Sequence, residues 1–334
     1  MSYFKDELNS ALFVAAYRGY RDITELLIAH GANVHLVDGS GETPLHKASV
    51  KGHLEIASLL IANGAKVDAK AQDGCTPLYL SAYSKHETVS QYLLDCGAAT
   101  EEDIAIMLGN IELVEHYFLK GADANSQLTK GYAKGESWLN IAVRHQNKNL
   151  VEFLLGRGAK INKKTGSFQL SPLHIAAIGS SDQTCKEDIC KILIAQGADI
   201  NSQDKNGTTP LHWAATVGNT KIVELLISHN ANVNALDFSH KTPLFEAARL
   251  HHVKIVNFLL SCGAEVNLTD DEGQTPLLRG FQKSGGDEII KALILHGADV
   301  NVQGSRQKSP LHLATAQNNL EIVKFLLEHG ALGS

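Results

Sequence analysis

The stretch Thr208-Thr209-Pro210-Leu211-His212-Trp213-Ala214-Ala215 decides the fold. Its core, Thr/Ser-Pro-Leu, recurs along the chain, and each copy lies 21 to 26 residues before a Gly-Ala or Asn-Ala pair. Successive pairs are mostly 33 residues apart, and a period of this length indicates ten stacked supersecondary units. The Thr/Ser-Pro-Leu copies begin at Thr43, Thr76, Ser171, Thr209, Thr242, Thr275 and Ser309. The pairs begin at Gly31, Gly64, Gly97, Gly121, Gly158, Gly197, Asn230, Gly263, Gly297 and Gly330, and they close repeats 1 to 10.

The residues between one marker and the next predict two helices and a turn. Thr43 can accept a backbone N–H at a helix start, and Pro44 suits the first helical position. A second helix follows with an apolar stripe that includes Ile56 and Leu60, and Gly64 can take the left-handed conformation that ends it. Such a unit cannot bury both faces alone, so its neighbours must cover it.

Composition limits the class of protein. The chain has 334 residues, 44% of them apolar, with a formal charge of −6, which disfavours binding a polyphosphate backbone by charge. No apolar run approaches the roughly 20 residues that cross a bilayer, and the charged start predicts no secretory signal. Five scattered cysteines favour a reduced, intracellular setting.

The repeated motifs resemble the ankyrin repeat, and the likeness covers residues 8–332. The resemblance implies an all-α repeat solenoid of antiparallel helix pairs with projecting β-hairpin fingers. It also implies a concave face of first helices and finger tips that grips a partner protein. The motifs are Thr-Pro-Leu-His at 43–46 and 209–212, Ser-Pro-Leu-His at 171–174 and 309–312, Gly-Ala-Asp-Ile-Asn at 197–201, and Gly-Ala-Asp-Val-Asn at 297–301.

The period breaks between repeats 3 and 4. Gly97 and Gly121 are 24 residues apart, which predicts that the finger before repeat 4 is missing. We expect one ankyrin array over 1–334, and a joint at this break would divide it into sub-arrays 1–99 (repeats 1–3) and 100–332 (repeats 4–10). The alternative is a tolerated deletion that leaves the stacking unchanged.

Two repeats are longer than the period. The repeat-5 finger, residues 125–136, carries Tyr132, and repeat 6 gains residues between its helices at 179–187. Extended loops carry contacts more often than standard ones do, although sequence drift would also explain both. Repeat 10 keeps an apolar stacking pattern through Ile322, so we expect the native chain to continue past Ser334 or to end on an apolar face.

The residue after each marker is free of folding duties in the family's pattern, so its identity should carry binding information. This column is apolar from repeat 3 to repeat 7, where it reads Leu80, Ile104, Ile141, Ile175 and Trp213. An aromatic-lined groove rimmed by charge would suit a protein–protein hot spot, whereas packing between first helices is the alternative. The predicted partner-binding residues are Leu80, Tyr83, Tyr132, Ile141, Phe168, Ile175, Trp213, Phe238, Glu246, Arg249 and Arg279.

Sequence motifs for chemistry are missing. The histidines fall at marker positions, helix ends and turns, and Cys185 and Cys190 lack zinc-finger spacing. We therefore expect no catalytic residue, no metal, no cofactor and no small-molecule substrate. Four turn asparagines resemble those that an oxygen-dependent hydroxylase modifies in animal ankyrin repeats, although a hydrogen-bonding turn role is the stronger hypothesis. They are Asn201, Asn234, Asn267 and Asn301.

These features predict a non-catalytic scaffold or adaptor that binds a partner protein or peptide on its concave face, centred on repeats 5–8. A bacterial effector that mimics such an adaptor inside a host cell is the alternative, and a mechanical spacer is the weaker one. We expect a monomer in the cytoplasm, or the host cytoplasm for an effector, without nucleic-acid binding or membrane insertion.

Overall fold

The fold is helical throughout the part of the chain that the structure describes. A computed structural model describes residues 2–131, 133–179, 184–282, 286–304 and 307–331. Over these ranges the chain forms twenty α-helices, and its β-pairing is limited to two isolated bridges, Gln127 with Ser137 and Thr165 with Leu170. The predicted solenoid of helix pairs is confirmed, but its fingers are turns rather than regular β-hairpins.

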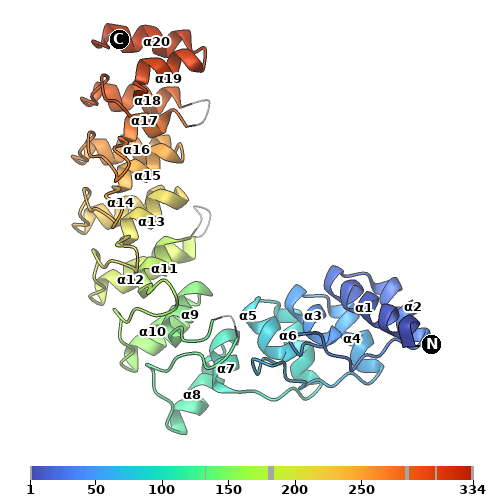
Figure 1. Ribbon diagram of the computed structural model, residues 1–334. Helices are drawn as coiled ribbons and strands as arrows, with labels where there is room; N and C mark the ends of the chain where they lie inside the picture. Colours follow the sequence, from blue (N-terminus) through green and yellow to red (C-terminus); the bar gives the residue numbers. More distant parts are fainter. Residues whose placement is uncertain (1, 132, 180–183, 283–285, 305–306, 332–334) are drawn as a thin grey trace. The chain divides into compact units, whose positions relative to one another are not determined.

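The contacts within the chain group it into two compact units. The first is Met1–Ala159, and the boundary predicted between residues 99 and 100 lies inside it, so the sub-arrays stay a prediction. This unit contains repeats 1 to 5 as five helix pairs (Figure 1). Its helices are α1 (Ser2–Arg18), α2 (Arg21–Ala29), α3 (Pro44–Lys51), α4 (Leu54–Ala62), α5 (Pro77–Tyr83), α6 (Glu87–Asp95), α7 (Glu102–Leu108), α8 (Ile111–Leu119), α9 (Trp138–Arg144) and α10 (Lys148–Gly156).

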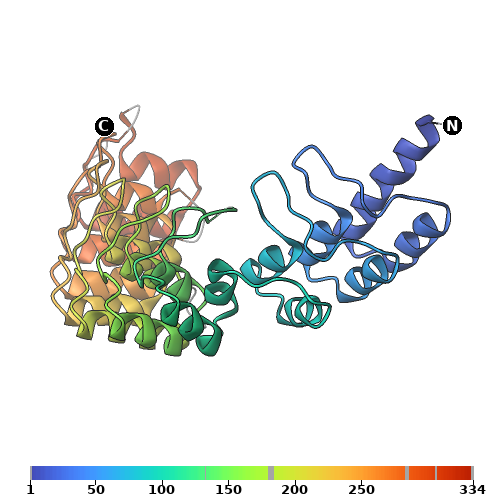
Figure 2. The same cartoon turned by 90° about the horizontal axis from the view of Figure 1, so that it is seen from below.

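The second unit, Lys160–Ser334, contains repeats 6 to 10. Within it the helix pairs follow one another in a single row, and the links between pairs project to one side (Figure 1 and Figure 2). Its helices are α11 (Pro172–Ala177), α12 (Thr184–Ala195), α13 (Pro210–Val217), α14 (Thr220–Ser228), α15 (Pro243–Arg249), α16 (Val253–Ser261), α17 (Pro276–Gly280), α18 (Asp287–Leu295), α19 (Pro310–Ala316) and α20 (Leu320–Glu328).

In repeats 2, 6 and 7 the histidine of the marker joins the first helix to the next repeat. In repeat 2, the Thr43 backbone N–H donates to His46 Nδ1 at 3.0 Å, so the ring is neutral with its proton on Nε2. His46 Nε2 donates in turn to the Cys75 carbonyl of repeat 3 at 3.1 Å. His174 and His212 bond the next repeat in the same way, and burial lowers the pKa of all three rings. The hydrogen bonds of these histidines hold neighbouring repeats together.

An aspartate organises the turn at the tip of several fingers. Asp204 Oδ1 accepts the backbone N–H groups of Asn206 and Thr208 at 2.8 and 3.0 Å, which closes a tight loop. Neighbouring tips are then linked by single backbone hydrogen bonds, because the Lys205 N–H donates to the Phe168 carbonyl at 2.9 Å. Asp38, Asp237 and Asp270 make equivalent turns.

The repeat-5 finger reaches back across repeat 4. The link between α6 and α7 is residues 96–101, less than half the length of the link between α4 and α5, as the short spacing predicts. The Thr129 N–H and Oγ1 donate to Asp103 Oδ2 at 2.9 and 2.7 Å. One residue further along, the Lys130 carbonyl accepts a hydrogen bond from Tyr79 Oη of repeat 3 at 2.6 Å. The long finger therefore contacts two earlier repeats, where repeat 4 has a shortened link.

Candidate protein-interaction surfaces

The predicted apolar column is not a solvent-facing groove. Leu80, Ile104, Ile141 and Ile175 are all buried, so the prediction that Leu80, Ile141 and Ile175 contact a partner is wrong for this structure. The physical reason is visible at the same position in other repeats, where longer side chains reach the finger of their own repeat. The column position therefore lies between the first helix and the finger of the same repeat. A short aliphatic side chain at this position is buried there.

Long polar side chains at the column position bond the finger aspartate. Trp213 Nε1 donates to Asp204 Oδ2 at 3.0 Å, and one Arg279 nitrogen lies 2.9 Å from Asp270 Oδ2. Lys47 pairs with Asp38 at 2.6 Å in the same arrangement. We expected Trp213 to be free of folding duties. It is half-buried instead, and its hydrogen bond to the finger serves the fold. Sequence reasoning missed these aspartates, although their recurrence five residues before the marker in repeats 2, 7, 8 and 9 was a usable signal.

The predicted charged rim is paired locally. Arg249 contacts the Glu246 carboxylate through two nitrogens, at 2.9 and 2.5 Å, three residues away on α15. Arg279 also approaches Glu272 at 3.0 Å and lies 5.2 Å from the centre of the Phe245 ring. These groups have partners within the fold, so their role in binding stays a prediction.

Two predicted aromatic residues do face solvent, both on finger tips of the second unit. Phe168 is 55% exposed and Phe238 is 66% exposed. Their backbones are fixed, because the Phe168 carbonyl accepts from Lys205 and the Phe238 N–H donates to the Asn206 carbonyl at 2.9 Å. The Phe238 ring also lies so close to Gly207 that a Cβ there would fall 2.5 Å from it. The fold thus presents two exposed rings on fingers 6 and 8, with finger 7 bonded to both.

The remaining predicted aromatics add little to this surface. Tyr83 is half-buried at the end of α5, in the first unit. Tyr132 lies outside the described residues. Next to Phe238, finger 8 carries His240, whose Nδ1 lies 2.5 Å from Asp271 Oδ1 on finger 9. The exposed finger tips therefore combine apolar rings with a polar histidine–aspartate contact.

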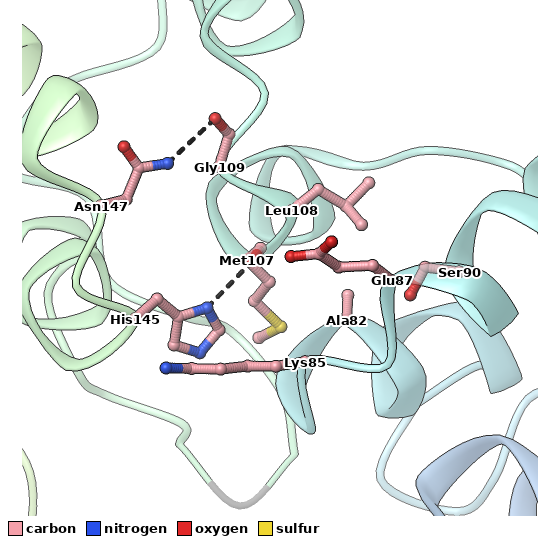
Figure 3. A pocket seen from close by; sticks show the side chains of 9 residues that line it. All are labelled: Ala82, Lys85, Glu87, Ser90, Met107, Leu108, Gly109, His145 and Asn147. Carbon is pink, nitrogen blue, oxygen red and sulfur yellow. Dashed lines mark hydrogen bonds between the residues drawn. The ribbon is translucent and has the colours of Figure 1, made fainter. Parts of the chain in front are cut away.

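A small cavity of about 120 Å³ lies where repeats 3, 4 and 5 meet (Figure 3). At the other seams of this unit, a residue before the second helix donates to the preceding repeat, as His86 does to the Val50 carbonyl and Asn147 to the Gly109 carbonyl. Among the described residues, Asn110 makes no such bond to repeat 3, and its side chain caps its own helix. The cavity lining is Ala82, Lys85, Glu87, Ser90, Met107, Leu108, Gly109, His145 and Asn147.

Nucleophilic chemistry is disfavoured at two buried cysteines, Cys75 and Cys190. Burial raises the pKa of the Cys75 thiol, and burial raises that of Cys190 to about 12, so neither is a thiolate near neutral pH. Across the described ranges no cluster of histidine, cysteine and carboxylate side chains could hold a metal ion. No helix in those ranges has the length and apolar character needed to span a bilayer.

The turn asparagines bridge neighbouring repeats. Asn267 Nδ2 donates to the Gly297 carbonyl at 3.0 Å, and its Oδ1 accepts the Asp299 N–H at 2.9 Å. Asn234 makes the same two bonds, to the Gly263 carbonyl and from the Glu265 N–H. Asn201 accepts the Asn232 N–H, and the Asn301 amide donates to the Gly330 carbonyl. These hydrogen bonds give the asparagines a structural role. Their hydroxylation stays a prediction, which mass spectrometry of peptides from the native protein would test.

Comparison with known proteins identifies the family. The family described as "Ankyrin repeats (3 copies)" matches residues 12–104, 102–204, 180–270 and 255–332. These matches cover nearly the whole chain, and the protein belongs to the ankyrin repeat family. Ankyrin repeats generally mediate protein–protein interaction, and the family is typically non-catalytic.

Three relatives illustrate how widely the repeat is distributed. An ankyrin repeat protein of Fowlpox virus (FPV031) is 32% identical over 230 residues, which is 68% of this chain and 46% of the viral protein. Alpha-latrotoxin-Lhe1a of Latrodectus hesperus is 32% identical over 108 residues, 32% of this chain and 7% of the toxin. The human 2-5A-dependent ribonuclease is 37% identical over 81 residues, 24% of this chain and 10% of the enzyme. The chain spans less than a tenth of the latrotoxins it matches.

Proposed function

We propose that this protein is a non-catalytic scaffold that binds a partner protein through the finger tips of repeats 6 to 8. The observation that carries the proposal is the exposure of Phe168 and Phe238 on fingers fixed by backbone hydrogen bonds. Aromatic side chains held in place lose little conformational entropy on binding and supply large contact areas. The surface differs from the predicted first-helix column, because that column packs inside the fold.

The setting that fits this function is intracellular, where ankyrin repeats are common. The adaptor and the bacterial effector would use the same finger tips, so the surface does not distinguish them. A mechanical spacer would need no exposed rings on its finger tips, and Phe168 and Phe238 therefore favour binding over a spacer role.

Affinity capture from a native lysate tests the proposal. The Phe168→Ala/Phe238→Ala variant should lose the partners that the wild-type chain retains. The matched control is Leu295→Ala/Leu320→Ala, which removes exposed apolar side chains at the ends of the second helices α18 and α20. Equal partner sets on both variants, as measured by quantitative mass spectrometry, would reject the finger tips as the binding surface.

A further inference from the structure

The first unit carries a separate hollow on its first helices. Phe13, Val14, Tyr17 and Arg18 of α1 and Lys47 of α3 line a space of about 270 Å³. Val14 is 56% exposed and Tyr17 is 41% exposed, so the hollow has an accessible apolar floor. We call these five residues, together with Lys51, the α1–α3 groove.

The floor is open because repeat 1 differs from the repeats that follow. Val14 holds the column position that Leu80 holds in repeat 3, yet Leu80 is buried and Val14 is not. In repeats 2, 7 and 9 the residue at this position bonds the finger that precedes its helix, as Lys47 does to Asp38. In repeat 1 the residues directly before Val14 are part of α1 itself, which runs from Ser2 to Arg18, and do not form a finger.

Cationic side chains lie near Tyr17 in this floor. The Lys51 ammonium lies 4.5 Å from the centre of the Tyr17 ring. A hydrogen bond from Lys51 and the charges of Lys51, Arg18 and Lys47 lower the pKa of the Tyr17 hydroxyl. Lys47 is neutralised by its ion pairs with Asp38 and Glu42, whereas Arg18 and Lys51 have no carboxylate partner among the described side chains. In a chain with a charge of −6, two such cations beside an apolar floor mark a local positive surface.

We propose that the α1–α3 groove binds an acidic peptide segment that carries one aliphatic or aromatic side chain. That side chain would lie on Val14 and Tyr17, and flanking carboxylates would meet Arg18 and Lys51. An apolar contact at the centre with charge at the edge is the arrangement of protein–peptide hot spots. Nucleic acid fits less well, because among the described side chains of the groove two cations, Arg18 and Lys51, lack a carboxylate partner, and an apolar floor offers no contact to a phosphate backbone.

A phage library of random dodecapeptides tests this inference on the whole chain. We expect the selected peptides to combine Asp or Glu with an apolar residue, and to bind more weakly as salt is raised. The Arg18→Glu/Lys51→Glu variant should bind a selected peptide at least about tenfold more weakly by fluorescence anisotropy. The matched control is Lys254→Glu/Lys324→Glu, which makes the same change in net charge at exposed sites of the second unit. Circular dichroism should show all variants folded.

Three results would overturn the proposal: no enrichment of acidic peptides, equal weakening by both charge reversals, or unchanged binding in Val14→Ser/Tyr17→Ser. The finger tips are assessed separately, because Phe168→Ala/Phe238→Ala should leave the selected peptide bound at wild-type affinity. Failure of the proposed finger-tip function would thus leave peptide binding at the α1–α3 groove unaffected, and failure of peptide binding would leave the finger-tip function unaffected.

Discussion

Tyr79 Oη donates a hydrogen bond of 2.6 Å to the Lys130 carbonyl, across 51 residues of sequence. The bond joins the first helix of repeat 3 to the finger of repeat 5, on the side where repeat 4 has a shortened link. The Lys130 ammonium lies 5.5 Å from the centre of the same ring and also pairs with Glu101 of repeat 4. A longer finger in one repeat therefore compensates for a shortened link in its neighbour.

Loss of this bond should weaken the first unit. Tyr79→Phe leaves the Lys130 carbonyl without its donor in a buried place, so the free energy of unfolding should fall by about 1–2 kcal/mol. Tyr20→Phe, which removes an exposed hydroxyl of repeat 1, is the control and should change it by less than about 0.5 kcal/mol. Urea titration of both variants measures the free energy of unfolding. Equal changes in the two variants would show that the finger contact contributes nothing to stability.

Trp213 should behave as a structural residue. Trp213→Phe keeps the ring but leaves Asp204 Oδ2, which is buried, without the indole donor. We expect the free energy of unfolding to fall by about 1–3 kcal/mol, while the captured partners stay the same. A variant that is as stable as wild type but loses its partners would instead place Trp213 in the binding surface.

The buried histidines should make stability depend on pH. The pKa of His145 is lowered to about 4, chiefly by burial and also by Lys85, against about 6.5 in an unfolded chain. Between those values the unfolded chain binds more protons, so the free energy of unfolding falls as pH drops from about 6.5 towards 4. The loss from this one residue is up to about 1.4 kcal/mol per pH unit.

Repeat 10 supplies a matched substitution for this site. Gln317 stands where His145 stands in repeat 5, and its Nε2 donates to the Phe281 carbonyl as His145 Nδ1 donates to the Met107 carbonyl. His145→Gln should therefore keep the bond and reduce the loss of stability between pH 7 and pH 5. An unchanged pH dependence, measured by urea unfolding at both values, would show that His145 does not titrate on unfolding.

The sequence predicts the elements of this fold better than its surface. The marker and the Gly-Ala pair place helices such as α3 and α13 correctly, because capping and periodicity are local properties. The exposure of Ile141 depends on what packs over it, and a position that the family leaves variable need not face solvent. The contact of Lys130 with Tyr79 could not be predicted from the sequence. The spacings show that repeat 4 has a short link and repeat 5 a long finger, but they do not show that the long finger packs where the link is short.

The central claim is that the exposed rings of Phe168 and Phe238, on finger tips 6 and 8, bind the partner. The most direct test is the Kd of the captured partner for wild type, Phe238→Ala and Leu295→Ala, measured by calorimetry. Phe238→Ala should raise the Kd about tenfold, which corresponds to about 1.4 kcal/mol, with an unchanged melting temperature, and Leu295→Ala should leave both unchanged. A Kd for Phe238→Ala equal to that of wild type would contradict the claim.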